Sequence, residues 1–128
     1  MKKILHSTMG LMTIEECERF LIAAFLEESK RDVVSLAFMV AVTRDEFNLT
    51  GQELVNFIQT CILALLENGL LPVRGNRPTR SWLRLFEGES SEKIADAIID
   101  EWVKSGVDPD LESPWFSSPV LLDKVNKN

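Results

Sequence analysis

The residues of this chain that could take part in catalysis are few, and they do not form a catalytic set. The chain has one histidine, His6, two cysteines, Cys17 and Cys61, and no tyrosine. A serine or cysteine nucleophile needs a base held beside it, and His6 lies near the chain start, outside any predicted element that would position it. Neither cysteine is directly flanked by a basic residue that would activate it. The sequence therefore predicts a protein that is not an enzyme.

One acidic stretch, Asp108, Asp110 and Glu112, has the alternating carboxylates that calcium and magnesium sites use. However, Pro109 separates the first two acids, and the stretch lacks both the turn glycine and the distant bidentate glutamate of a calcium loop. A solvated acidic turn is the better interpretation. The segment GNRPTR lacks the spacing and the lysine of a phosphate-binding loop. We therefore expect neither a metal nor another cofactor.

Charged residues are unevenly distributed along the chain, whose net charge is −6. Four arginines fall in one turn-rich segment without an intervening acid: Arg74, Arg77, Arg80 and Arg84. Residues 87–112 contain nine acids and two lysines, a local charge of −7. An acidic balance disfavours nucleic acid or an anionic membrane as the partner and suits a basic protein.

The arginine-rich segment has two interpretations. On a hairpin that follows a helix, it is similar to the wing of a winged-helix DNA-binding domain, so a small nucleic-acid-binding transcriptional regulator is the alternative function. The helix that would then enter the groove, residues 50–69, has no basic residue, and it lacks the attraction to phosphate that dominates affinity. In the second interpretation, the arginines pair with the acidic helix that follows them.

The acidic residues also have two interpretations. Asp96, Asp100 and Glu101 fall opposite the apolar stripe of a helix predicted from Ser90 to Gly106, so they share its solvent-facing side. Such a face is either an ordinary solvated surface or a docking surface whose charge speeds the encounter with a basic partner. We place the predicted partner contact on this face, the acidic turn and an aromatic anchor: Asp96, Asp100, Glu101, Asp108, Asp110, Glu112, Trp115 and Phe116.

The elements that must position these residues are predicted from helical periodicity and capping signals. The central one is a strongly apolar helix that begins with a capping box at Thr50 and Glu53 and ends at Gly69 in the left-handed conformation. A second capping box, Thr13 with Glu16, predicts a helix that ends near residue 29.

Other segments are less regular. Residues 33–42 are apolar on all sides, and periodicity does not distinguish a buried strand from a buried helix there. The length of the run favours a helix from Asp32 to about Phe47. The segments LLPV and SWLRLF predict a hairpin, with Pro72 confining the first strand to a sheet edge. The apolar residues 120–122 are expected to add a short strand.

Together these elements predict an α+β fold that is mainly helical, with about four helices around the central buried helix and a small antiparallel sheet or hairpin. A chain of 128 residues is long enough for a single domain, residues 1–128, with its own core. Residues 1–12 and 123–128 are expected to be flexible arms.

The expected compartment is the cytoplasm. The two cysteines could pair, but their positions on apolar helical faces favour buried thiols in a reducing cytosol. No apolar run reaches the roughly 20 residues of a membrane span, and the chain start lacks the long apolar region and cleavage site of a signal peptide.

Four features of the sequence together resemble a known class of small bacterial proteins: a helix that ends in LLENG, the strand LLPV, the helix start GESSEKI and the late segment SPWF. The layout is similar to immunity proteins of the contact-dependent growth inhibition (polymorphic toxin) type, over roughly residues 30–118. The resemblance implies a non-enzymatic inhibitor that binds one cognate toxin domain, commonly a nuclease, and occludes its active site. It assigns no contact residues, because contact surfaces differ between such pairs. A subunit or adaptor of a larger assembly would differ only in its partner.

Overall fold

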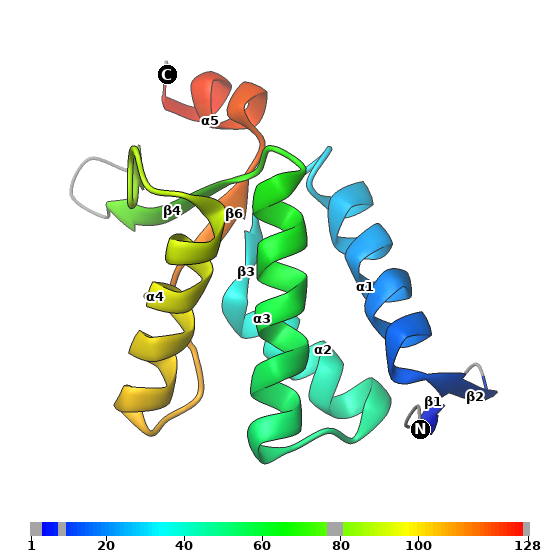
Figure 1. Ribbon diagram of the computed structural model, residues 1–128. Helices are drawn as coiled ribbons and strands as arrows, with labels where there is room; N and C mark the ends of the chain where they lie inside the picture. Colours follow the sequence, from blue (N-terminus) through cyan, green and yellow to red (C-terminus); the bar gives the residue numbers. More distant parts are fainter. Residues whose placement is uncertain (1–3, 8–9, 77–80, 127–128) are drawn as a thin grey trace.

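The computed structural model describes residues 4–7, 10–76 and 81–126 and shows an α+β fold that is mainly helical (Figure 1). Its elements are β1 (Ile4–Ser7), β2 (Gly10–Thr13), α1 (Ile14–Glu28), β3 (Val34–Ser35), α2 (Leu36–Phe47), α3 (Gly51–Glu67), β4 (Leu71–Asn76), β5 (Ser81–Arg84), α4 (Ser91–Ser105), β6 (Trp115–Ser117) and α5 (Pro119–Asn126). Strands β1 and β2 form a hairpin, and the other four form an antiparallel sheet of order β3-β6-β4-β5. The predicted fold class is confirmed.

Helix α3 is the central element, as predicted. It packs against α1, α2 and α4, and Figure 1 shows it between α1 and α4. Its inward residues are almost completely buried: Phe57, Ile58, Cys61, Ile62 and Leu65. The helix ends as expected at Gly69, whose φ is +92°. The Gly69 N–H donates to the Leu66 carbonyl at 3.0 Å and the Leu70 N–H to the Leu65 carbonyl at 3.1 Å, the bond pattern of a Schellman motif.

The predicted capping box at the start of α3 is wrong. Thr50 occupies the N-cap position, but its side chain makes no capping hydrogen bond. The reason is local geometry, because the next residue, Gly51, has a φ of +59°. This left-handed conformation of Gly51 changes the direction of the chain directly after Thr50. The Thr50 hydroxyl is therefore not placed to accept from the backbone N–H groups that it would cap.

The capping box at the start of α1 is confirmed. Thr13 Oγ1 accepts from the Glu16 N–H at 3.1 Å, and Glu16 Oε1 accepts from the Thr13 N–H at 3.0 Å. The side of α1 that faces the core consists of three buried residues, Cys17, Leu21 and Phe25. Two orphan donors at the helix start are thereby satisfied while its apolar side packs on α3.

The ambiguous run at residues 33–42 contains both a strand and a helix start. Val34–Ser35 pair with β6, and α2 begins after Ser35 rather than at Asp32. The Ser35 side chain accepts from the Phe38 N–H at 3.0 Å and so caps the helix. The helix predicted up to Phe47 is confirmed, but its predicted start is wrong, because pairing with a distant strand holds two residues extended.

The predicted hairpin of β4 and β5 is confirmed, but the edge position expected for Pro72 is wrong. Strand β4 lies between β6 and β5, and Pro72 is opposite Phe116 of β6. The Pro72 carbonyl accepts from the Leu85 N–H at 2.9 Å, just beyond the end of β5. The N–H and C=O of one strand residue point to the same side of the strand, so the position where Pro72 lacks an N–H faces Leu85 and not β6. Pairing with β6 therefore loses no hydrogen bond at Pro72.

Both ends of the chain have more regular structure than the sequence predicted. Within the segment expected to be a flexible arm at residues 1–12, β1 and β2 form a hairpin in which Leu5 is buried. Residues 120–122, expected to be a strand, belong to the fifth helix, α5, which continues to Asn126 and so includes part of the arm expected at 123–128. Helical spacing in α5 was missed because the apolar run is only three residues long.

Candidate functional site

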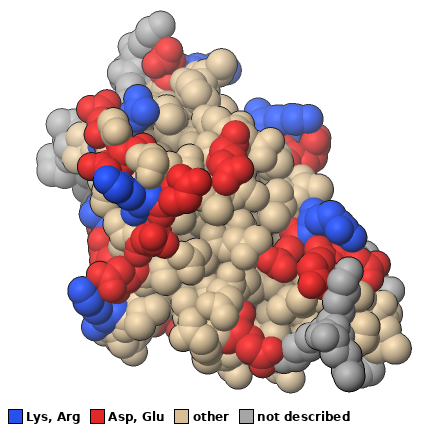
Figure 2. Space-filling model, in the orientation of Figure 1, with Lys and Arg blue, Asp and Glu red and all other residues tan. Residues whose placement is uncertain are grey.

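The predicted partner contact begins on helix α4, which is amphipathic as expected. Four residues on one side are buried: Ile94, Ala95, Ile98 and Ile99. The Ser90 side chain accepts from the Lys93 N–H at 3.3 Å and caps the helix, and Gly106, with a φ of +70°, ends it. The side turned to solvent carries Asp96, Asp100 and Glu101, all exposed as predicted. Figure 2 shows acidic side chains as a band over this part of the molecule, with basic side chains among them.

The loop after α4 is held in place by side chains from three other elements. Arg44 of α2 binds both carboxylate oxygens of Asp108, each at 2.9 Å. The Arg74 Nε of β4 donates to the Glu112 carbonyl at 2.9 Å, and the Trp115 Nε1 of β6 donates to the Leu111 carbonyl at 3.1 Å. The loop therefore has a defined shape even though most of its residues are exposed.

Helix α4 and this loop enclose a hollow of about 220 Å³. Four of the predicted acidic residues line it, namely Glu101, Asp108, Asp110 and Glu112. Apolar side chains complete its wall, among them Ile98, Trp102, Pro109 and Pro114. We call this feature the acidic hollow. The other two predicted acids, Asp96 and Asp100, lie on α4 outside it.

Several of these carboxylates have partners within the chain. Glu101 pairs with Arg74 at 3.0 Å, and Asp100 pairs with Lys104 at 2.8 Å. Asp96 accepts a hydrogen bond from Gln59. Ion pairs this exposed contribute little to stability, so their main effect is to orient the carboxylates and reduce the local charge. The charge of this surface is therefore smaller than the sequence suggests.

The pKa values of the paired groups follow these contacts. The hydrogen bonds from Arg44 lower the pKa of the Asp108 carboxyl below its ordinary value. In the same way, the hydrogen bond to Asp100 raises the pKa of the Lys104 ammonium. In each case the partner favours the charged form of the group.

The two predicted aromatic anchors are placed differently from each other. Phe116 is completely buried in the core, so its side chain is not accessible to a partner. Trp115 is partly exposed and meets Trp82 edge-on, with ring centroids 5.4 Å apart. Its ring borders a second, apolar groove beside β3 and does not line the acidic hollow. Trp102 of α4, which is partly buried, is the aromatic residue that lines the acidic hollow.

The arginine-rich segment does not present its described arginines as one cationic surface. Arg74 is engaged by Glu101 and by the Glu112 carbonyl, while Arg84 lies 3.8 Å from Glu87. Arg77 and Arg80 lie outside the described residues. Helix α3, which would enter the groove of DNA in the alternative interpretation, is buried in the core on its apolar side and flanked by three helices.

The histidine and the two cysteines lie in three different elements, β1, α1 and α3. Cys17 and Cys61 are free and completely buried, and burial raises the pKa of both thiols. His6 lies in β1 opposite Leu11. Within residues 4–7, 10–76 and 81–126, no three His, Cys, Asp or Glu residues are grouped so that they could hold a metal ion. None of the helices in this part of the chain is long and apolar enough to cross a membrane.

No protein-family model, curated protein or solved structure matches this chain.

Proposed function

We propose that this chain is a non-enzymatic inhibitor that binds a basic partner protein, and that it serves as an immunity protein against a toxin domain. The observation that carries the proposal is the acidic hollow, whose lining combines acidic residues of α4 and of the following loop with apolar side chains. A lysine or arginine side chain has the matching chemistry, because its aliphatic stem packs on apolar surface while its cation meets carboxylates. The partner surface that fits presents a protruding lysine or arginine, such as one at the rim of the basic cleft of a nuclease.

The surroundings of the acidic hollow support recognition of a protein. Trp102 lies in its wall, and a cation over an indole face gains further attraction. Since Arg44 and Arg74 already hold the loop, binding would cost little ordering of the chain. If the bound cation lies at the rim of a partner's active site, the surface around the hollow would cover that site. Two buried free cysteines are compatible with a reducing compartment, and we place the protein in the cytoplasm.

A growth-rescue experiment tests the proposal. The product of the adjacent gene, which the proposal expects to carry a toxin domain, is expressed in bacteria with and without the full chain, and rescue of growth is expected. Association of the two purified proteins is then followed by stopped flow. The variant Asp110→Asn with Glu112→Gln should associate about tenfold more slowly and with a weaker salt dependence, because charge steers the encounter. Asparagine retains the oxygen with which Asp110 accepts from the Glu112 N–H at 2.9 Å.

The matched control is Glu67→Gln with Asp123→Asn, which removes the same charge from exposed positions outside the hollow. It should leave both association and its salt dependence nearly unchanged. Equal effects of the two double variants would show that only net charge matters and would remove the acidic hollow from the proposal. A neighbouring gene product that is not inhibited would reject the immunity function.

A further inference from the structure

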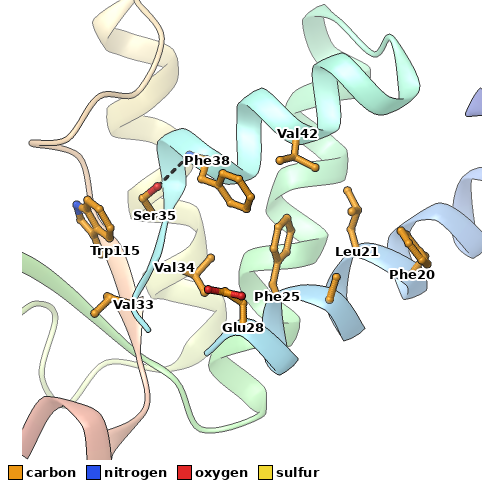
Figure 3. A pocket seen from close by; sticks show the side chains of 11 residues that line it. Phe20, Leu21, Phe25, Glu28, Val33, Val34, Ser35, Phe38, Val42 and Trp115 are labelled. Atoms are coloured by element: carbon orange, nitrogen blue, oxygen red, sulfur yellow. Dashed lines mark hydrogen bonds between the residues drawn. The ribbon is translucent and has the colours of Figure 1, made fainter. Parts of the chain in front are cut away.

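A second concave feature lies beside β3, away from the acidic hollow. It is a groove of about 600 Å³ between α1, α2 and β3 (Figure 3). Its lining is almost entirely apolar and includes Phe20, Leu21, Phe25, Val34, Phe38 and Trp115. We call it the apolar groove. A groove of this size is large enough to take up several side chains of a binding segment.

Two aromatic side chains of the apolar groove remain in contact with water. Phe20 is 42% exposed and Phe38 is 52% exposed. Phe38 meets the buried ring of Phe25 edge-on, with ring centroids 6.3 Å apart. The Phe38 ring is therefore packed against the core on one side and exposed to solvent on the other. Figure 3 shows the Phe38 ring turned toward Phe25 in the space between α1 and α2, with Phe20 farther along α1. Exposed aromatic rings that continue a concave apolar surface are typical of an interaction site.

Strand β3 presents its outer edge to this groove. It is the terminal strand in the sheet order, and its only described neighbour is β6 on the other side. The Leu36 N–H donates to the Pro114 carbonyl at 3.1 Å. This bond shows which residues of β3 direct their N–H and C=O groups toward β6 and which direct them outward. In an antiparallel pair, alternate residues direct both peptide groups toward the partner strand. Val34 and Leu36 therefore face β6, and the Val33 carbonyl and the Ser35 N–H point outward.

Glu28 is the one charged residue among those that line the apolar groove. Figure 3 shows its carboxylate over the groove near Val34. Arg31 binds its Oε2 at 2.8 Å from an exposed position, and a carboxylate can accept from a second cation as well. Glu28 and the net charge of −6 disfavour an anionic amphiphile such as a fatty acid, and they disfavour a second copy of this chain. They favour an occupant with a basic residue.

We propose that the apolar groove binds an extended segment of a partner protein, in which a bulky apolar residue is followed or preceded closely by lysine or arginine. The segment pairs with the outer edge of β3 through the Val33 carbonyl and the Ser35 N–H. Its apolar side chain packs against Phe38 and Phe25, and its cation meets Glu28. A helix has no free backbone groups with which to meet a strand edge, so it fits the site less well. This second surface does not depend on the acidic hollow or on the proposed inhibitory function.

The test uses a phage-displayed library of random dodecapeptides selected on the immobilised full chain. Enriched peptides should combine a leucine, isoleucine or phenylalanine with a lysine or arginine within two positions. Their affinity should fall at least about tenfold with Phe38→Ser, as for a central anchor residue. It should fall about threefold with Glu28→Gln, and that loss should shrink at high salt. Amide hydrogen exchange at Ser35 should slow when the peptide binds.

The matched control is Val120→Ser on α5, where an apolar side chain that is 78% exposed lies outside the groove. It should leave peptide affinity unchanged. Thermal unfolding of each variant confirms that the fold is retained. The proposal is overturned if no peptide is enriched, if the selected peptides bind Phe38→Ser equally well, or if their apolar residues have helical spacing. It is also overturned if sedimentation shows a dimer of the full chain that Phe38→Ser dissociates.

Discussion

Arg44 of α2 and Asp108, 64 positions later in the chain, form a two-point ion pair: Nη1 lies 2.9 Å from Oδ2 and Nη2 lies 2.9 Å from Oδ1. The planar guanidinium matches the carboxylate at both oxygens, which fixes the orientation of the pair as well as its distance. Because Asp108 lines the acidic hollow, the shape of that hollow is tied to helix α2.

Replacing Arg44 with lysine should loosen the loop with little effect on global stability. Lysine keeps the charge but cannot bind both oxygens in a fixed plane. The Arg44 and Asp108 side chains are 37% and 65% exposed, so the free energy of unfolding should fall by no more than about 1 kcal/mol. Hydrogen exchange of the amides in residues 107–113 should become faster. Arg19→Lys, on an exposed part of α1, is the control, and equal protection in the two variants would contradict the prediction.

The contribution of this ion pair to stability should depend on pH in one direction. Arg44 lowers the pKa of Asp108 in the folded protein, so the pair stabilises the fold above the unfolded pKa and loses this effect as pH falls through the folded pKa. The window lies below about pH 4, the ordinary range of an aspartate. A double-mutant cycle with Arg44→Gln and Asp108→Asn should give a favourable coupling at pH 6 that disappears near pH 2. A coupling that persists at low pH would contradict this account.

The exposed aromatic residues of the apolar groove should contribute less to stability than the buried residues of the core. Ile62 is completely buried in α3, whereas Phe38 is 52% exposed. Ile62→Ala should lower the free energy of unfolding by about 2–5 kcal/mol, because it leaves a cavity that the core cannot fill. Phe38→Ala should lower it by about 1 kcal/mol or less. Urea unfolding measures both, and similar losses would show that Phe38 is a structural residue and not part of a binding surface.

Local signals in the sequence predicted the elements whose ends depend on neighbouring residues. Thr13 with Glu16, Ser90, Gly69 and Gly106 all mark helix ends where they were expected. The sequence failed where a distant contact decides the local conformation. Residues 34–35 are extended because β6 pairs with them, and no property of the run itself distinguishes them from the helix that follows.

The candidate site was predictable in part. Charge counting located the acidic segment, and helical periodicity placed Asp96, Asp100 and Glu101 on the solvent side of α4. The interpretation that the arginines pair with the following acidic helix agrees with the Arg74–Glu101 ion pair. The sequence did not identify this particular pair, because it joins residues 27 positions apart. The apolar groove was missed because the exposure of Phe38 depends on how α1 and α2 diverge, whereas the apolar run around it suggested burial on all sides.

The chain should not bind DNA through its hairpin. Arg74 is already engaged by Glu101, and the apolar side of α3 is buried. In a gel-shift assay at about 50 mM salt, where phosphate contacts are strongest, the full chain should leave a double-stranded DNA fragment unshifted. A shift that weakens with added salt and is lost in Arg84→Ala would restore the regulatory alternative. Arg19→Ala is the charge-matched control.

Both cysteine thiols should be unreactive in the folded protein. Cys17 and Cys61 are completely buried, and burial, together with the negative charge of nearby glutamates, raises the pKa of each thiol above its ordinary value. Since the thiolate is the reactive form, Ellman's reagent at pH 8 should label neither residue in the native chain and both of them after denaturation in urea. Labelling should therefore report unfolding, and destabilised Ile62→Ala should react faster than Phe38→Ala. Rapid labelling of the native chain, or a disulfide between the two cysteines, would contradict their assignment to the core.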